Sequence, residues 1–231
     1  MAEPITSQPE ISKTAGSSVT GPWVYFFGGK TLPESAASGE GREDHYEVRS
    51  VVPVCGQNPV RIDSGSHLVR IETGSPLSSE PSMKAEWRGM VRHLQYTTQE
   101  LRQELQERSA KECLSERTMA VLIPIRKSAE WWALAQDERQ RHFCKPAARE
   151  NHSTIGHRYA DRIYRRLYHC RYLEPLPEYD FLTYFEFPED DTEIFKELLK
   201  NLRDLNMNPE WKFVDREVEI WMSKGERRSV L

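Results

Sequence analysis

Hydrophobic and polar residues follow two different periods in the second half of the chain. Apolar residues recur at helical spacing in several segments. From Ile163 to Cys170 the period changes to two, because the odd-numbered and even-numbered residues form two separate sets, as on the two faces of a strand. The turn-like LEPLPEYD and a second alternating run follow, so this region predicts a hairpin. The predicted elements are a strand at Met119–Ile125, helices at Trp131–Phe143 and 150–160, strands at 163–170 and Phe181–Phe187, an amphipathic helix at Asp190–Leu205 and a strand at Trp211–Trp221.

The first half of the chain favours strands and is less regular. A Ser-, Thr- and Pro-rich stretch over residues 1–21 has few large apolar groups and predicts a disordered tail. After it, the aromatic run Trp23–Phe27 ends in two glycines and predicts a strand. Further predicted elements are strands at Tyr46–Val54, His67–Glu72 and Glu86–Tyr96, and a largely exposed helix at Thr97–Leu114.

The order of these elements indicates an α+β fold. Strand, helices, hairpin, helix and strand over residues 118–222 match the split βαβ pattern of a ferredoxin-like βαββαβ unit. The earlier strands are interpreted as a second, degenerate copy. We therefore predict a tail (1–21), a degenerate ferredoxin-like half (22–116) and a second ferredoxin-like half (117–231) that carries the site.

Composition narrows the possible partners and the cellular location. The chain has 32 Lys+Arg against 36 Asp+Glu, a net charge of -4, which argues against a nucleic-acid or anionic-membrane partner. No apolar run approaches the roughly 20 residues of a bilayer span. The N-terminus does not resemble a secretory signal, so a cytoplasmic location is expected. The four cysteines have no metal-binding spacing and are expected to be free thiols.

His152 and Arg165 lie on either side of the change in period and are the candidate chemical pair. A helix that ends near Tyr159 can turn back, so that an imidazole faces the following strand instead of lying about 20 Å from the arginine, as one straight helix at ~1.5 Å per residue would place it. Arg165 and Leu167 share one face of their strand. A lone histidine is most often structural, and His157 is a competitor, so the pattern alone predicts only an α+β domain with a cofactor pocket.

Several stretches resemble the chlorite dismutase family of haem b proteins, and in particular its shorter lineage, whose members are typically dimers. The resemblance implies the dimeric α/β-barrel type of fold, a homodimer and one haem b per subunit. It is carried by LIPIRKSAEWWALAQDERQRHF (122–143), HSTIGHRYADRIYRRLYHCRYL (152–173), YDFLTYFEF (179–187) and PEWKFVDREVEIW (209–221), with EWRG (86–89) and WVYFFGG (23–29) as weaker matches.

The resemblance assigns a role to each matching residue. His152, which leads the H-x6-Y-x5-R pattern, falls on the proximal ligand of the haem iron, and Glu210 on the carboxylate that hydrogen-bonds this histidine. Arg165 falls on the distal catalytic arginine. The remaining matches are Leu167, Thr183 and Phe185 in the distal wall, Lys127 and Trp131 at the haem propionates, and Trp132 nearby.

The implied activity is conversion of the anion chlorite to chloride and O2 at ferric haem. Arg165 suits an anionic substrate, because a guanidinium attracts chlorite and holds the departing hypochlorite without giving up a proton. The alternatives are a coproheme decarboxylase, in which an uncharged residue commonly replaces this arginine, and a non-catalytic haem-binding protein. The chain departs from the family pattern in the longer segments 144–151 and 54–83, and in Ala160-Asp161.

Overall fold

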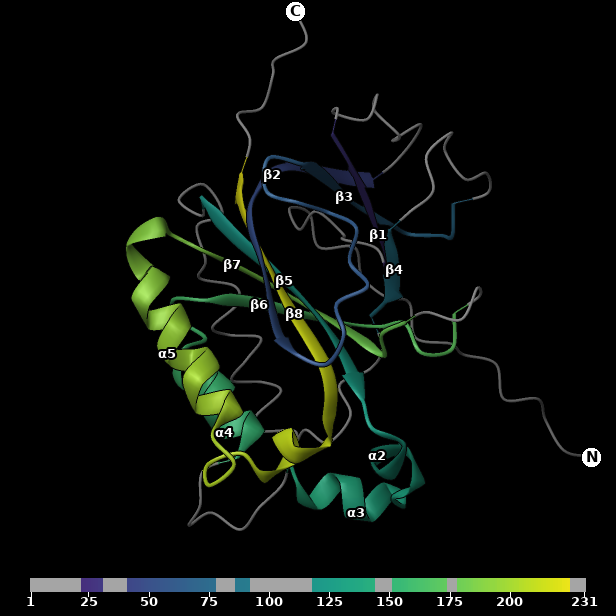
Figure 1. Ribbon diagram of the computed structural model, residues 1–231, viewed down its shortest axis with the longest axis vertical. Helices are drawn as coiled ribbons and strands as arrows, with labels where there is room; N and C mark the ends of the chain where they lie inside the picture. The colour runs from purple at the N-terminus through teal and green to yellow at the C-terminus, as the bar shows by residue number, and fades with distance from the viewer. Residues whose placement is uncertain are drawn as a thin grey trace, which may run out of the picture.

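Eight β-strands in the computed structural model close into one antiparallel barrel (Figure 1). The structure describes residues 22–30, 41–77, 86–91, 118–143, 151–173 and 178–224. Around the barrel the strands follow the order β1-β3-β2-β8-β5-β7-β6-β4, and β4 pairs with β1 to complete the ring. Their bounds are β1 Trp23–Gly29, β2 Gly41–Cys55, β3 His67–Thr73, β4 Trp87–Met90, β5 Met119–Lys127, β6 Tyr164–His169, β7 Phe181–Phe187 and β8 Val214–Lys224.

Helices follow or connect the strands of the second half. They are α2 Ala129–Ala133, α3 Gln136–Arg141, α4 His152–Arg158 and α5 Thr192–Arg203, with single 3-10 turns at η2 Glu189–Asp191 and η3 Pro209–Phe213. Helices α4 and α5 lie together on one side of the barrel, and α2 and α3 lie near one end of it (Figure 1). No helix in the described ranges is long and apolar enough to cross a membrane.

The alternation along each strand separates an inner core from an outer one. Leu182 and Tyr184 of β7 belong to the cluster that fills the barrel, together with Leu122 of β5. Their neighbours Phe185 and Phe187 belong instead to a second cluster, which α4 and α5 cover. Successive side chains of a strand point to opposite faces. The outer face of the second half is therefore the face on which a site between sheet and helices can form.

The barrel corrects the predicted fold class. The α+β fold of two ferredoxin-like halves is wrong, because strands outnumber helices among the described elements and join into one closed antiparallel barrel. Strand β2 pairs with β3 on one side and with β8 on the other, and β4 pairs with both β1 and β6. The strand pairing thus continues from one half into the other at both seams. The boundary near residue 117 stays a prediction.

Most predicted elements are confirmed, with one helix divided. The backbone is extended at Leu134 and Ala135, so the segment Trp131–Phe143 forms α2 and α3, and the Ala135 N–H donates to Glu138 at 2.7 Å. Cys55 and Cys170 are free thiols, as expected. The predicted tail (1–21), the helix at Thr97–Leu114 and the other two cysteines lie outside the described residues.

Candidate functional site

Helix α4 begins at His152 because the preceding residue caps it. The Asn151 side chain accepts hydrogen bonds from the backbone N–H groups of Ser153 (2.9 Å) and Thr154 (3.1 Å). The Thr154 hydroxyl in turn accepts from the Asn151 N–H at 2.9 Å. This reciprocal capping box satisfies N–H groups that have no partner within a helix. It fixes His152 as the first helical residue, with its ring beside the sheet.

Glu210 lies between His152 and Lys127 and contacts both. The His152 Nδ1 atom is 3.2 Å from Glu210 Oε2, and the Lys127 ammonium pairs with Glu210 Oε1. Burial alone would raise the pKa of this carboxyl, but the ammonium and the imidazole outweigh it and hold the pKa well below its usual range. Glu210 is therefore an anion beside Nδ1, which favours the tautomer with its proton on Nδ1 and its lone pair on Nε2.

The Nε2 atom of His152 faces Arg165 on β6, at 3.0 Å from Nη2. Burial, with a further contribution from the Arg165 charge, lowers the pKa of His152 despite the opposing effect of Glu210. The imidazole is therefore neutral near pH 7, and Nε2 accepts a hydrogen bond from the guanidinium. His157 lies five residues further along, about 140° around the helix axis from His152. The structure thus brings together His152, rather than its competitor, with Arg165 and Glu210.

Arg165 stands in a wall whose other members come from two paired strands. Arg165 lies opposite Phe185, and Leu167 opposite Thr183, in the antiparallel register of β6 and β7. The face that alternation predicts Arg165 and Leu167 to share is confirmed, and the register places Phe185 and Thr183 on the same face. Thr183 and Phe185 are 4% and 2% exposed, so one charged group and one hydroxyl occupy a mainly apolar surface.

The helix facing Arg165 carries a glycine where a side chain would crowd this space. A Cβ atom at Gly156 would lie 3.3 Å from Arg165 Nη1, closer than ordinary contact. Burial lowers the pKa of Arg165, but the group still carries its charge at neutral pH because its ordinary pKa is far higher. A cation is thus held between α4 and the sheet.

Lys127, Trp131 and Trp132 lie at the end of β5 and in α2. The Lys127 ammonium, besides its pair with Glu210, lies 4.9 Å from the centre of the Trp131 ring. The Trp132 ring stacks on Phe181. These contacts place Lys127 on the histidine side of the site, whereas the predicted contacts of Lys127 and Trp131 with haem propionates stay predictions.

Asp180 organises this region and was missed in the sequence. Its carboxylate, 5% exposed as a residue, accepts hydrogen bonds from the Lys127 N–H (2.7 Å), the Trp132 indole (3.2 Å) and Arg171 (2.8 Å). The Arg171 guanidinium also covers the Trp132 ring at 3.9 Å. An aspartate that ends the turn-like LEPLPEYD gives no signal of this role in a single sequence.

Comparison with known proteins identifies the family. The family model described as chlorite dismutase matches residues 72–222, more than half of the chain. The chain belongs to the chlorite dismutase family. Among solved structures, the dimeric chlorite dismutase from Nitrobacter winogradskyi is 32% identical, with a TM-score of 0.64 over 87% of this chain and 99% of that one.

More distant relatives support the same fold. A mutant chlorite dismutase from Candidatus Nitrospira defluvii is 20% identical, with a TM-score of 0.60 over 91% of this chain and 93% of that one. The chlorite dismutase of Ideonella dechloratans is 30% identical over 89 residues, which are 38% of this chain. That match spans 27% of the curated relative, about a quarter of its length.

Proposed function

We propose that this protein is a haem b-dependent chlorite dismutase that converts chlorite into chloride and O2, and that it acts as a homodimer. The arrangement of Glu210, His152 and Arg165 carries the proposal. It combines a neutral imidazole, a carboxylate anion that orients it and a guanidinium in an apolar wall. Membership of the chlorite dismutase family and likeness to a dimeric member support the same assignment.

The residues fit a haem in their chemistry. A neutral imidazole with its Nδ1–H bound to a carboxylate is the form of histidine that binds iron, through Nε2. The absence of a side chain at Gly156 lets the Arg165 guanidinium lie against the helix. Because Arg165 contacts Nε2 at 3.0 Å, the guanidinium must move away before iron can occupy that position. His152 would hold the iron, and Arg165 would face the substrate.

Each residue then has a distinct task in the reaction. Haem, when bound, supplies the iron at which a Cl–O bond of chlorite is cleaved. Glu210 keeps the proton on Nδ1, so that His152 offers a lone pair throughout. Arg165 attracts the chlorite anion and retains the anionic chlorine fragment, since a guanidinium keeps its proton at any relevant pH. Leu167 and Phe185 exclude water, which strengthens the attraction between cation and anion.

The test is reconstitution with haem b followed by a chlorite assay in an oxygen electrode. We expect a ferric haem spectrum and O2 evolution. Haem binding without O2 would refute the activity and leave a haem-binding protein. Conversion of iron coproporphyrin III to haem with peroxide, without O2 from chlorite, would identify a decarboxylase instead. His152→Ala should abolish haem retention, while the matched control His157→Ala, on the same helix, should retain it.

A further inference from the structure

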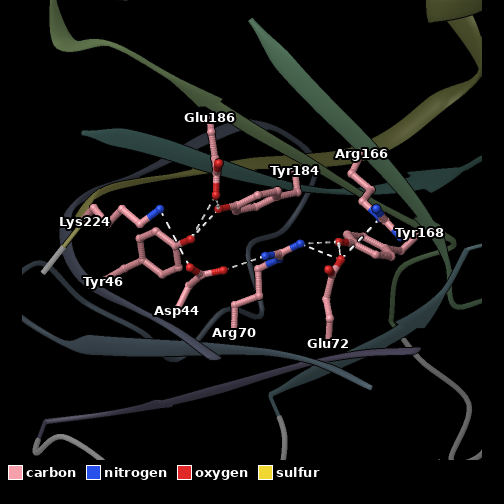
Figure 2. Close-up of polar contacts among 9 residues, drawn as sticks. All are labelled: Asp44, Tyr46, Arg70, Glu72, Arg166, Tyr168, Tyr184, Glu186 and Lys224. Carbon is pink, nitrogen blue, oxygen red and sulfur yellow. Dashed lines mark hydrogen bonds and ion pairs between the residues drawn. The ribbon is translucent and has the colours of Figure 1, made fainter. Parts of the chain in front are cut away.

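The interior of the barrel holds a buried polar network on the face of the sheet opposite the candidate site. Arg70 of β3 is 1% exposed and donates to Asp44 at 2.8 Å and to Tyr168 at 2.8 Å, and it pairs with Glu72 at 2.5 Å. Figure 2 shows its guanidinium between these groups. A buried charge is tolerated only when it is paired and hydrogen-bonded. The network therefore joins β2, β3 and β6 across the barrel.

Two of the carboxylates in this network are matched by cations. Asp44 contacts Arg70 and lies 3.7 Å from the Lys224 ammonium. Glu72 contacts Arg70 and lies 3.3 Å from Arg166. Glu72 also accepts a hydrogen bond from the Tyr168 hydroxyl, so this phenol bonds a carboxylate that is already paired with two guanidinium groups.

The third carboxylate, Glu186, has phenols as neighbours. Tyr184 donates to Glu186, Tyr46 lies 3.3 Å from the same oxygen, and the two phenol oxygens are themselves hydrogen-bonded (Figure 2). Burial raises the pKa of both Tyr46 and Tyr184, so neither phenol loses a proton by simple ionisation at neutral pH. Glu186 is placed to accept a proton that leaves a phenol together with an electron.

The surroundings of Tyr184 favour joint loss of the proton and the electron. The Arg70 guanidinium lies 4.4 Å from the centre of the Tyr184 ring. This cation opposes positive charge on the ring, so removal of an electron alone is disfavoured. If the phenol proton moves to Glu186 in the same event, the ring stays neutral, and Tyr46 can donate a hydrogen bond to the oxygen that lost the proton. The arrangement thus supports a neutral tyrosyl radical.

Tyr184 also lies close behind the candidate site. It sits on β7 between Thr183 and Phe185, and adjacent side chains of a strand point to opposite faces. Those two neighbours form part of the wall around Arg165. One strand thus carries the wall on its outer face and the phenol on its inner face, with one residue step between them.

We propose that Tyr184, with Glu186 and Tyr46, is an oxidisable site that gives one electron to the haem site; this inference rests on the proposed function. The electron passes to a haem that peroxide has oxidised above the ferric state, which is thereby reduced by one electron. The O–H bond of Tyr184 breaks, and its proton forms an O–H bond on Glu186. The products are a neutral tyrosyl radical and a protonated carboxyl, so charge and atoms balance.

The experiment is electron paramagnetic resonance on haem-loaded protein that is mixed with hydrogen peroxide and frozen within seconds. We expect a tyrosyl signal that narrows when the protein contains ring-deuterated tyrosine. Tyr184→Phe and Glu186→Gln should each lose it. Tyr168→Phe is the matched control, because Tyr168 lies in the same network but bonds the cation-paired Glu72, and it should keep the signal.

A second arm separates this inference from the proposed function. Haem-free protein is oxidised by illuminated ruthenium tris-bipyridine with persulfate, and the spectrum of Tyr184→Phe is subtracted from that of the unchanged protein. A tyrosyl difference signal supports the site even if the protein does not bind haem. A signal that is unchanged in Tyr184→Phe, one that is lost equally in Tyr168→Phe, or no tyrosyl radical in either arm would overturn the proposal.

Discussion

Lys127→Met tests the chain of contacts that runs from Lys127 through Glu210 to His152. The paired Lys127 and Glu210 side chains are 6% and 4% exposed. Methionine fills similar space but removes the ammonium, and leaves a buried carboxylate facing a neutral imidazole. Removing one partner of a buried ion pair costs about 3–5 kcal/mol. We expect the free energy of unfolding to fall by about 3 kcal/mol, near the lower end of this range, because Glu210 can reduce the penalty by taking up a proton.

The effect of Lys127→Met on the free energy of unfolding depends on pH, and the pKa of Glu210 sets the direction of that dependence. In the unchanged protein the pKa of Glu210 is depressed on folding, so its contribution to stability is present above the unfolded pKa of roughly 4.3 and declines as pH falls below it. In the variant, burial raises this pKa, so the folded state gains stability as pH falls from neutral. The difference in free energy of unfolding between the two proteins should therefore narrow between about pH 7 and pH 4.

The assay is urea unfolding of haem-free protein, followed by circular dichroism at several pH values. The double variant that combines Lys127→Met with Glu210→Gln provides the control, because it carries no unpaired buried charge. Its free energy of unfolding should fall by less than the sum of the decreases in the two single variants. A loss below about 1 kcal/mol at pH 7 would show that the pair contributes little, contrary to its burial. An equal loss at pH 4 and pH 7, or additive single losses, would refute the electrostatic reasoning.

Three further changes test other parts of the molecule. Burial raises the pKa of Glu217 to about 7 despite its hydrogen bond from Arg203. The folded state therefore holds the Glu217 proton more tightly than the unfolded state, and the stability that this proton contributes at acidic pH is lost as pH rises through 7. Glu217→Gln should therefore flatten the urea-unfolding profile from pH 5 to 8 by up to about 3 kcal/mol, and an unchanged slope would contradict this. Asp180→Asn should lower the free energy of unfolding by about 1–3 kcal/mol and shift Trp132 fluorescence, whereas an unaltered emission spectrum would count against its positioning role. Arg165→Ala should retain haem but stop evolving O2 earlier in turnover, and equal total O2 per haem would exclude a role in retaining the chlorine fragment.

Local pattern was sufficient for the strands and their faces, but not for barrel closure. Strand β7 spans the predicted Phe181–Phe187, and alternation correctly placed Arg165 and Leu167 on one face of β6, whereas the register with β7 was needed to bring Thr183 and Phe185 to that face. The pairing of β2 with β8, which joins the two halves, depends on which distant edges meet. Hydrophobic period is a property of a single segment and contains no information on that choice. Two open sheets and one closed barrel are therefore compatible with the same local pattern.

The buried charges show a second limit of sequence patterning. On β3, Arg70 and Glu72 share the inward face with Leu68, although charged positions in an alternating strand usually predict the solvent face. They are inside because each meets a partner from another strand, as Arg70 meets Asp44. In the same way, the approach of Glu210 to His152 was expected only from family resemblance, since no local spacing connects the two segments.

The two faces of β6 and β7 are mechanically linked, because a strand cannot shift one face without the other. A slip of one residue in β6 would turn Arg165 into the barrel and remove Tyr168 from Arg70, to which it is bonded at 2.8 Å. Arg70 and Glu72 would then lose a hydrogen-bond partner in a buried place, at a cost of about 1–3 kcal/mol for each unsatisfied group. The interior network therefore holds the register that aims Arg165 at His152, and the chemistry of the outer face depends on charges buried on the inner one.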